Sequence, residues 1–280
     1  MLELNHQAVL SILPDRDENA HKGDFGKILL LCGSKGYTGA AYLAAMGALR
    51  SGAGLVFLGV PESIYAIEAG KLNEAIVFPL PEEGGKLSAD AIPEILERMS
   101  KMDAVLIGCG LGQSVGTFSV VKAVLENAKC PVVVDADGIK VLSTHKDILR
   151  GRKYPTILTP HDGEFRRLGG EIGDDRMASA EVLAKELGCI LLLKGHRTCI
   201  TDGKKGYVNN TGNPGMAVGG SGDLLAGIIV SLLGQEIEPI QAAAVGAWLH
   251  GAAGDICAGE IGQYGMLPTD MLSVLPRLMK

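Results

Sequence analysis

Short apolar runs recur along the chain, and most are separated by segments in which apolar residues return at helical spacing. Several of the runs show no alternation with polar residues, which is typical of strands buried on both faces. We expect strands at Ile28–Cys32, Leu55–Val60, Ala75–Phe78, Ala104–Ile107, Pro131–Asp135, Thr156–Thr159 and Ile190–Lys194. We expect helices at Ala40–Ser51, Ala89–Lys101, Thr117–Ala128, Gly138–His145 and Asp174–Leu187. This alternation predicts an α/β fold whose central, mostly parallel sheet carries helices on both faces.

The pattern changes after Lys194. Residues 198–201 and 207–209 flank the turn-forming sequence Asp202-Gly203-Lys204-Lys205-Gly206, which predicts an antiparallel hairpin. A glycine-rich loop and two apolar helices follow, the second at Gln241–Ala258. No repeat, linker or low-complexity tract interrupts the chain, so we expect residues 1–280 to form one domain.

The glycine-rich stretch from Gly212 to Asp223 is the most informative part of the chain. Its glycines allow close approach of a ligand to the backbone, and the apolar residues from Leu224 onward predict a helix. The free N–H groups of Gly220, Ser221, Gly222 and Asp223 would lie at the positive end of that helix, which favours binding of an anion such as phosphate. The Asp223 carboxylate either caps the helix or acts as a base beside the bound phosphate.

Polar or glycine-rich clusters follow five of the expected strands. They are Gly33–Ala40, Gly108–Gly112, Asp135–Gly138, Thr159–Glu164 and Lys194–Thr198. In open α/β sheets the carboxyl ends of the strands form the ligand site, so these clusters and the anion loop predict one cleft.

The other candidate residues each have two interpretations. Asp135 and Asp137 either cap the following helix or approach Mg²⁺ through water. His161 is a candidate ligand contact at a helix start, where Asp162 is the better candidate cap. Lys194–Thr198 supplies cations and a hydroxyl suited to phosphate, and His250 is expected to be a packing residue.

Composition narrows the class of protein. Hydrophobic residues are 47% of the chain, the formal net charge is −6, and no large Lys/Arg cluster occurs, which argues against nucleic acid as a partner. The 6 cysteines are scattered without a C-x-x-C pair and are expected to be reduced core residues. No secretory signal or membrane-spanning run is visible, so we expect a soluble, cytoplasmic protein that does not engage a membrane.

No nucleotide-binding fingerprint of the common kinds is present. The Gly-Lys pairs lack the Ser or Thr of a Walker A loop, and Gly108–Gly112 lacks the spacing of a Rossmann motif. Gly219-Gly220-Ser221-Gly222-Asp223 instead resembles the anion hole and catalytic aspartate of the ribokinase-like superfamily. The strings at residues 21–27, 39–41, 50–54, 158–161, 193–195 and 213–217 are similar to those of the ADP/ATP-dependent NAD(P)H-hydrate dehydratases. The resemblance runs from about His21 to the C-terminal helix, with Ser221 where Thr is usual.

The resemblance implies a repair reaction in a stand-alone dehydratase. The enzyme would dehydrate the (S)-hydrate of NADH or NADPH, coupled to hydrolysis of ADP or ATP with Mg²⁺, through a phosphorylated intermediate. Asp223 would be the base, and Gly220, Ser221 and Gly222 would complete the anion hole. The family also implies hydrate-binding residues at Ala41, Gly110, His161, Asn213 and Asp223. It implies nucleotide-binding residues at Lys194, Gly195, His196, Arg197, Thr198 and Gly222, and a homotetramer.

Two other functions fit parts of the same pattern. A ribokinase-superfamily kinase for a vitamin alcohol, of hydroxyethylthiazole or pyridoxal type, would use the same loop and Asp223. It would release its phosphorylated product intact, and residues 213–217 favour the dehydratase. A non-catalytic nucleotide sensor is disfavoured, because a binding protein gains nothing from a carboxylate beside phosphate oxygens.

Overall fold

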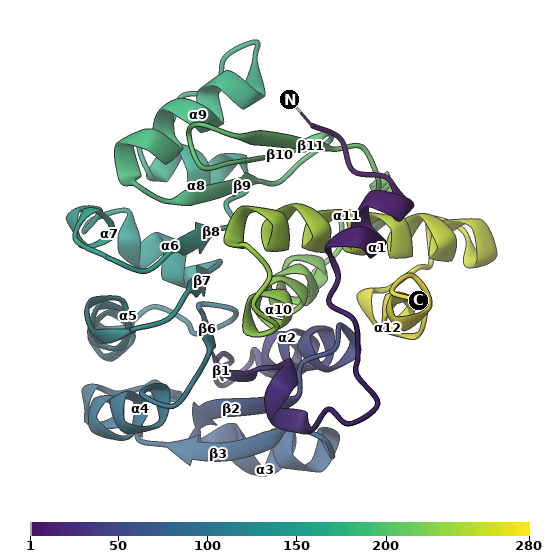
Figure 1. Cartoon of the computed structure of the whole chain (residues 1–280). Coiled ribbons are helices and arrows are strands. Elements are labelled where there is room, and N and C mark those ends of the chain that lie inside the picture. The colour runs from purple at the N-terminus through teal and green to yellow at the C-terminus, as the bar shows by residue number, and fades with distance from the viewer. Residues whose placement is uncertain (1) are drawn as a thin grey trace.

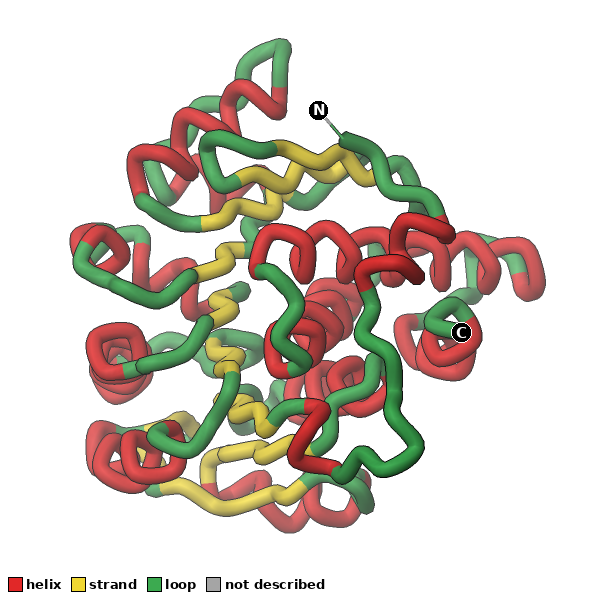
Figure 2. The backbone as a smooth tube through the Cα atoms, in the orientation of Figure 1, coloured by secondary structure: helices red, strands yellow, loops and turns green. Residues whose placement is uncertain are grey.

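A nine-stranded sheet forms the centre of the computed structural model, which describes residues 2–280. The strand order is β11-β10-β9-β8-β7-β6-β1-β2-β3, and Figures 1 and 2 show the sheet running through the molecule between two layers of helices. Its strands are β1 (Lys27–Leu31), β2 (Leu55–Pro61), β3 (Ile76–Leu80), β6 (Ala104–Ile107), β7 (Val132–Val134), β8 (Thr156–Leu158), β9 (Ile190–Leu193), β10 (Thr198–Thr201) and β11 (Gly206–Asn209). A separate small hairpin joins β4 (Glu82–Glu83) to β5 (Lys86–Leu87).

The sheet is parallel from β3 to β9 and antiparallel at one edge. Strands β3, β2, β1, β6, β7, β8 and β9 pair in parallel. The hairpin of β10 and β11 adds antiparallel strands beside β9. This arrangement confirms the predicted α/β fold class, and each strand expected from the apolar runs is present.

Helices cover both faces of this sheet (Figure 1). One face carries α2 (Thr38–Arg50), α3 (Glu62–Lys71), α10 (Ser221–Gly234) and α11 (Pro239–Ile261), with α1 (His6–Ile12) and α12 (Pro268–Val274) outside them. The other carries α4 (Ile92–Met99), α5 (Val115–Asn127), α6 (Asp137–Leu142), α7 (Asp147–Arg150), α8 (Asp162–Arg167) and α9 (Arg176–Leu187). Single 3-10 turns lie at η1 (Lys22–Phe25), η2 (Ala89–Ala91), η3 (Pro214–Met216) and η4 (Leu275–Arg277). Helices α1, α3, α7 and α12 were not predicted, because they are short or only weakly periodic, and only the start of α8 was expected.

Two aliphatic cores lie on the two sides of the sheet. Alternate residues of β1 divide between them: Ile28 and Leu30 pack under α10 and α11, and Leu29 and Leu31 pack under α4 and α5. Each of these side chains is fully buried. Strands of this kind must be apolar on both faces, which explains why their sequences show no alternation.

Glycines bring α2 and α10 unusually close together. A Cβ on Gly47 of α2 would lie 2.6 Å from the carbonyl oxygen of Leu224, and a Cβ on Gly227 of α10 would collide with the carbonyl of Ala44. The contact places α10 against β1, β6 and β7. The position of its N-terminus is therefore fixed by backbone-to-backbone packing.

The chain reverses its direction of strand addition between β1 and β6. From β1 it proceeds outward through β2 and β3, and from β6 it proceeds the opposite way. Loops after these two strands are tied together, since Gly33 donates its N–H to the Cys109 carbonyl at 2.7 Å and Ser34 donates to the Gly110 carbonyl at 2.7 Å. Such a switch point is where open α/β sheets bind ligands.

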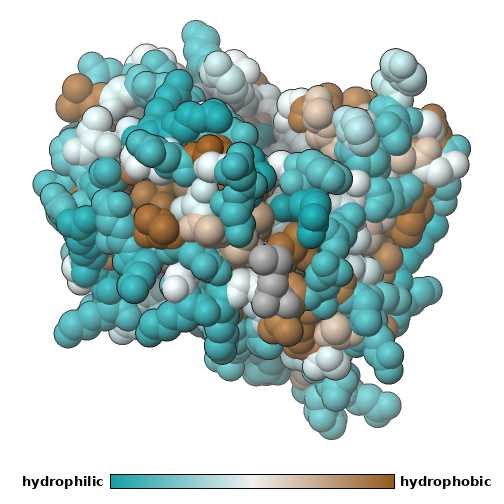
Figure 3. Space-filling view, turned by 90° about the horizontal axis from the view of Figure 1, so that it is seen from above, coloured by the Kyte–Doolittle hydropathy of each residue, from teal (hydrophilic) through white to brown (hydrophobic). Residues whose placement is uncertain are grey.

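No helix within residues 2–280 has the length and apolar content required to cross a membrane. The face seen in Figure 3 is mostly hydrophilic, with small hydrophobic patches scattered between charged side chains. Scattered exposed apolar residues are normal on a protein surface.

Replacing Gly227 with alanine tests the α2–α10 contact. We expect Gly227→Ala to lower the free energy of unfolding by about 1–3 kcal/mol, because the methyl group forces the two helices apart. Gly70, in α3, has open space around its Cα, so Gly70→Ala serves as the control and should raise stability by about 0.5–1 kcal/mol. Urea denaturation of both variants measures the difference, and equal effects would contradict the packing argument.

Candidate active site

The anion loop has the predicted geometry. Gly220 is the N-cap of α10 with a left-handed backbone (φ 93°), and the helix begins at Ser221. A Cβ on Gly220 would displace the end of the Leu43 side chain, and the left-handed backbone itself favours glycine. No side-chain hydrogen bond caps this helix. The Ser221 N–H donates to the Val218 carbonyl at 3.3 Å, and the N–H groups of Gly222 and Asp223 stay available for an anion.

Helix α11 holds the start of the loop in place. Both carboxylate oxygens of Asp255 accept hydrogen bonds from it, one from the Gly212 N–H at 2.8 Å and one from the Asn213 amide at 3.0 Å. Thr211 donates its hydroxyl to the Trp248 carbonyl at 3.1 Å. A Cβ on Gly251 would collide with Thr211, so the loop lies directly against the helix backbone.

A cavity of about 700 Å³ opens beside the loop. Its walls bring together segments far apart in the sequence: the loop after β9, the end of β11, the anion loop and α11. The predicted site residues that line it are His161, Lys194, Gly195, His196, Arg197, Thr198, Asn213, Ser221 and Gly222. A volume of this size is typical of pockets for a nucleotide-sized ligand.

Other predicted site residues lie away from the cavity walls. Ala41 is fully buried beneath Gly33, so its side chain is closed to the cavity. Gly110 adopts a left-handed conformation (φ 64°) close to Ala40, on the β1–β6 side of the anion loop. Asp223, in the first turn of α10, also lies on this side, near Cys109. The predicted residues thus form two groups, with the anion loop between them.

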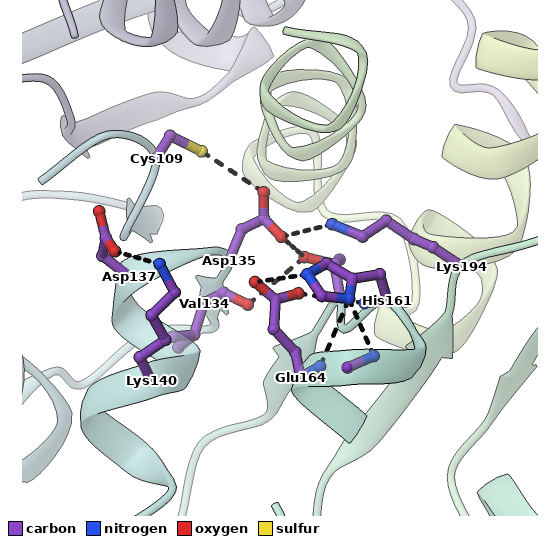
Figure 4. A network of polar contacts seen from close by, with 10 residues as sticks. Cys109, Val134, Asp135, Asp137, Lys140, His161, Glu164 and Lys194 are labelled. Carbon is purple, nitrogen blue, oxygen red and sulfur yellow. Dashed lines mark hydrogen bonds and ion pairs between the residues drawn. The ribbon is translucent and has the colours of Figure 1, made fainter. Parts of the chain in front are cut away.

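A partly buried ion pair faces the first turn of α10 (Figure 4). Lys194 donates to Oδ1 of Asp135 at 2.8 Å, and the same oxygen accepts the Thr159 hydroxyl at 2.7 Å. A Cβ on Gly222 would lie 3.3 Å from the Lys194 ammonium nitrogen. Burial opposes the charge of Lys194, but Asp135 outweighs it and raises the pKa of Lys194. A fixed cation therefore stands beside the anion-binding N–H groups.

Asp223 is a carboxyl group with a raised proton affinity. Burial is the largest cause, and the nearby negative charge of Asp135 adds to it, so the pKa of Asp223 rises to about 6. The Cys109 thiol and Lys194 partly offset this increase. One ligand atom from each of Cys109, Asp135 and Asp223 lies within 4.8 Å of the others. A carboxylate with a pKa near neutrality is suited to general-base catalysis.

His161 has a different local role from the one expected of it. Its Nδ1 accepts hydrogen bonds from the N–H groups of Gly163 at 3.0 Å and Glu164 at 3.4 Å, so His161 is the N-cap of α8. The expectation that Asp162 would be the cap was wrong. Asp162 pairs instead with Arg176 at 2.8 Å, and the imidazole accepts the N–H groups because it precedes the helix. The ring remains about 59% exposed and lines the cavity.

Neither Asp135 nor Asp137 caps α6, so the capping alternative was wrong for both. The N-cap is Ala136, with a positive φ of 48°. Asp137 lies in the first turn, accepts the Gly112 N–H at 2.8 Å and pairs with Lys140 at 2.7 Å. Asp135 is committed to Lys194 and Thr159, because it ends a buried strand that leads straight into the site.

Two contacts in the site were missed from the sequence. His250, expected to be a packing residue, is indeed buried, but its Nε2 lies 3.3 Å from the Ser221 hydroxyl and its ring lines the cavity. Cys109, expected to be a reduced core residue, is buried and free, but its thiol also donates to Asp135 at 3.8 Å. Neither contact has a local sequence signal, because each joins residues on different elements.

The fold and the anion loop define a ribokinase-like protein. A crystal structure of a ribokinase-like superfamily protein from Enterococcus faecalis superposes with a TM-score of 0.88 at 29% identity, covering 99% of this chain and 94% of that one. The family model for NAD(P)H-hydrate dehydratase matches residues 28–277. The chain therefore belongs to the NAD(P)H-hydrate dehydratase family.

Curated relatives give the same assignment. The ADP-dependent (S)-NAD(P)H-hydrate dehydratase of Bacillus subtilis is 37% identical over 97% of this chain and 95% of its own length. The ADP/ATP-dependent NAD(P)H-hydrate dehydratase of B. subtilis, co-crystallised with ATP and Mg²⁺, has a TM-score of 0.84 at 33% identity, covering 98% of this chain and 96% of that one. The bifunctional NAD(P)H-hydrate repair enzyme Nnr of Moorella thermoacetica is 46% identical over 96% of this chain but only 52% of its own length. The chain thus spans about half the length of that relative.

The raised pKa of Asp223 makes a prediction about stability. The carboxyl group of Asp223 binds its proton more tightly in the folded protein than in the unfolded chain. Ionisation of Asp223 therefore leaves the free energy of unfolding unchanged below pH about 4 and lowers it by the full amount above pH about 6. We expect Asp223→Asn to raise the free energy of unfolding by on the order of 2 kcal/mol at pH 8 and by much less at pH 4. Urea denaturation at both pH values measures this difference. An increase in the free energy of unfolding that is the same at both pH values would contradict a raised pKa of Asp223.

Proposed function

We propose that this protein dehydrates the hydrate of NADH or NADPH and couples the reaction to hydrolysis of ADP or ATP. The observation that supports this most directly is the position of Asp223, a carboxylate of raised pKa in the first turn of α10 beside an uncapped helix N-terminus. Phosphoryl transfer to a hydroxyl requires a base and a phosphate held in line, and catalysis is then mainly positioning and charge stabilisation.

The nucleotide would occupy the cavity of about 700 Å³, with its terminal phosphate at the Gly222 N–H and the Ser221 hydroxyl. Lys194 lies where its ammonium group can neutralise the phosphoryl oxygens, and Asp135 keeps that side chain charged and fixed. The residues from Gly195 to Thr198 would hold the rest of the nucleotide. These donors are preorganised, so they need little rearrangement when charge develops.

The hydrate would approach from the side of Ala41 and Gly110. Asp223 would remove the proton from its ring hydroxyl, and the oxygen would attack the terminal phosphorus, displacing AMP from ADP or ADP from ATP. The phosphorylated ring would then lose phosphate from one carbon and a proton from the neighbouring carbon, which restores the dihydronicotinamide. His161 and Asn213 line the nucleotide cavity, so their contact with the hydrate would be made at its edge.

Mg²⁺ would enter with the nucleotide, as in the B. subtilis crystal preparation that contained ATP and Mg²⁺. Within residues 2–280, the group of candidate ligands whose donor atoms converge is Cys109, Asp135 and Asp223. Mg²⁺ prefers oxygen, retains waters and takes one or two carboxylates, so Asp135 and Asp223 fit it and the thiol does not. The ion would supply charge neutralisation at the phosphates.

The other properties rest on the family resemblance and the composition. We propose that residues 1–280 act as one ribokinase-like unit, that the protein is a homotetramer and that it works in the cytoplasm. A vitamin-alcohol kinase of the same superfamily would share the Asp223 geometry but would keep its phosphorylated product. The fate of the phosphate therefore separates the two functions.

An absorbance assay tests the proposed activity. Purified protein, Mg²⁺ and hydrated NADH are mixed, ADP or ATP is added separately, and the return of the dihydronicotinamide band is followed. We expect recovery that depends on a nucleotide, and the same experiment identifies the phosphate donor. Nucleotide binding without recovery under either condition would rule out the dehydratase and favour a kinase.

Replacing Asp223 separates binding from chemistry. We expect Asp223→Asn to retain nucleotide affinity and to lower kcat by at least about a thousandfold, since the amide cannot accept the hydroxyl proton. Asp162→Asn is the matched control, because that carboxylate faces Arg176 rather than the anion loop. Calorimetric titration and the absorbance assay give the two quantities, and near-wild-type turnover by Asp223→Asn would exclude it as the base.

A further inference from the structure

His250 joins helix α11 to the first residue of the anion loop helix. Its ring is buried, with 8% of the residue exposed, and Nε2 lies 3.3 Å from the Ser221 hydroxyl oxygen. Both residues line the cavity proposed for the nucleotide. A buried imidazole that only filled space would have no need to present a nitrogen to a hydroxyl of the site.

The protonation state of the ring follows from its surroundings. Burial lowers the pKa of His250 to about 4, and the positive charge of Lys194 acts in the same direction, so the ring is neutral near pH 7 with one N–H. A hydrogen bond with the Ser221 backbone opposes this shift. A neutral imidazole has one donor nitrogen and one acceptor nitrogen, so Nε2 can donate to the Ser221 hydroxyl oxygen that lies 3.3 Å away.

We propose that His250 is a positioning residue that donates its Nε2 hydrogen to the Ser221 hydroxyl oxygen and so directs the Ser221 hydroxyl hydrogen toward a phosphoryl oxygen of the nucleotide. A serine hydroxyl has one hydrogen and two lone pairs, so accepting from His250 leaves the hydrogen free for the anion. Hydrogen bonds in such a chain polarise one another, which makes the hydroxyl a better donor. The inference rests on the proposed function in taking the anion to be the phosphate of ADP or ATP.

Helix α11 makes this arrangement possible. The same helix fixes the start of the anion loop through Asp255 and presents the Gly251 backbone to Thr211. His250 precedes Gly251 in the chain, so its backbone belongs to the part of α11 that packs directly against the loop. The imidazole therefore meets Ser221 in a fixed geometry, which a flexible side chain would not provide.

A double-mutant cycle tests the coupling. The affinity for ADP is measured by calorimetry in wild type, His250→Leu, Ser221→Ala and the double variant, and kcat is measured with hydrated NADH. We expect each single variant to lose about tenfold in ADP affinity or kcat, and the double variant to lose no more than Ser221→Ala alone. Losses that multiply in the double variant would overturn the proposal, because they would show that His250 acts without Ser221.

Two further variants separate positioning from packing. His250→Gln places an amide N–H near the position of Nε2, so it should recover part of the loss seen in His250→Leu. His145→Leu is the matched control, since His145 is exposed and packs on Phe118, and it should bind ADP as wild type does. Equal losses in His250→Gln and His250→Leu would mean that the ring matters for its shape alone.

The tautomer is observable in the unmodified protein. In a sample labelled with ¹⁵N-histidine, long-range ¹H–¹⁵N correlation resolves the 6 imidazoles, and His250→Gln identifies the one from His250. We expect a neutral ring protonated at Nε2, and protonation at Nδ1 alone would overturn the proposal. This measurement and the ADP titrations need no turnover. If wild type bound ADP but left hydrated NADH unchanged, the proposed function would fail while the role of His250 was still decided.

Discussion

The close contact between helices α2 and α10 is the constraint from which the geometry of the site follows. Glycines at positions 47 and 227 allow the two backbones to approach each other, and this holds α10 against β1, β6 and β7. The N-terminus of α10 consequently lies where β6 and β7 end, since Asp223 in its first turn lies beside Cys109 and Asp135. A helix N-terminus can hold an anion only if its N–H groups are free and correctly placed, and here packing supplies the placement.

The edge of the sheet must supply both a cation for the phosphate and a carboxylate of raised pKa as the base, and these two groups lie close together. An anionic substrate requires a cation, which Lys194 provides, but a buried ammonium group is costly without a partner. Asp135 is that partner, and its negative charge also contributes to the raised pKa of Asp223. The ion pair therefore serves both the phosphate and the base. Removing Lys194 would leave the buried carboxylate of Asp135 without its cation, and removing Asp135 would leave the partly buried Lys194 without its anion.

The sequence predicted the elements whose signal is local. Each parallel strand is a continuous apolar run, and the anion loop combines glycines with a helix start, so both could be located without structural information. The start of α8 was expected, but its cap was not, because an imidazole caps this helix rather than the aspartate that follows. Helix α7 was missed, since a helix of 4 residues carries no measurable periodicity. The ion pair of Lys194 with Asp135, separated by 59 residues, and the His250–Ser221 contact, separated by 29, depend on tertiary packing that local patterns do not encode.

In the proposed reaction, a hydroxyl of the substrate attacks the phosphate held at the N-terminus of α10. Isotope transfer tests this most directly: hydrated NADH carrying ¹⁸O in its ring hydroxyl is turned over with the accepted nucleotide, and the released phosphate is analysed by mass spectrometry. We expect the label to appear in inorganic phosphate, because the ring oxygen bonds to phosphorus before its bond to carbon breaks. Label found in water, with unlabelled phosphate, would contradict it and show that nucleotide hydrolysis and dehydration proceed without a phosphorylated intermediate.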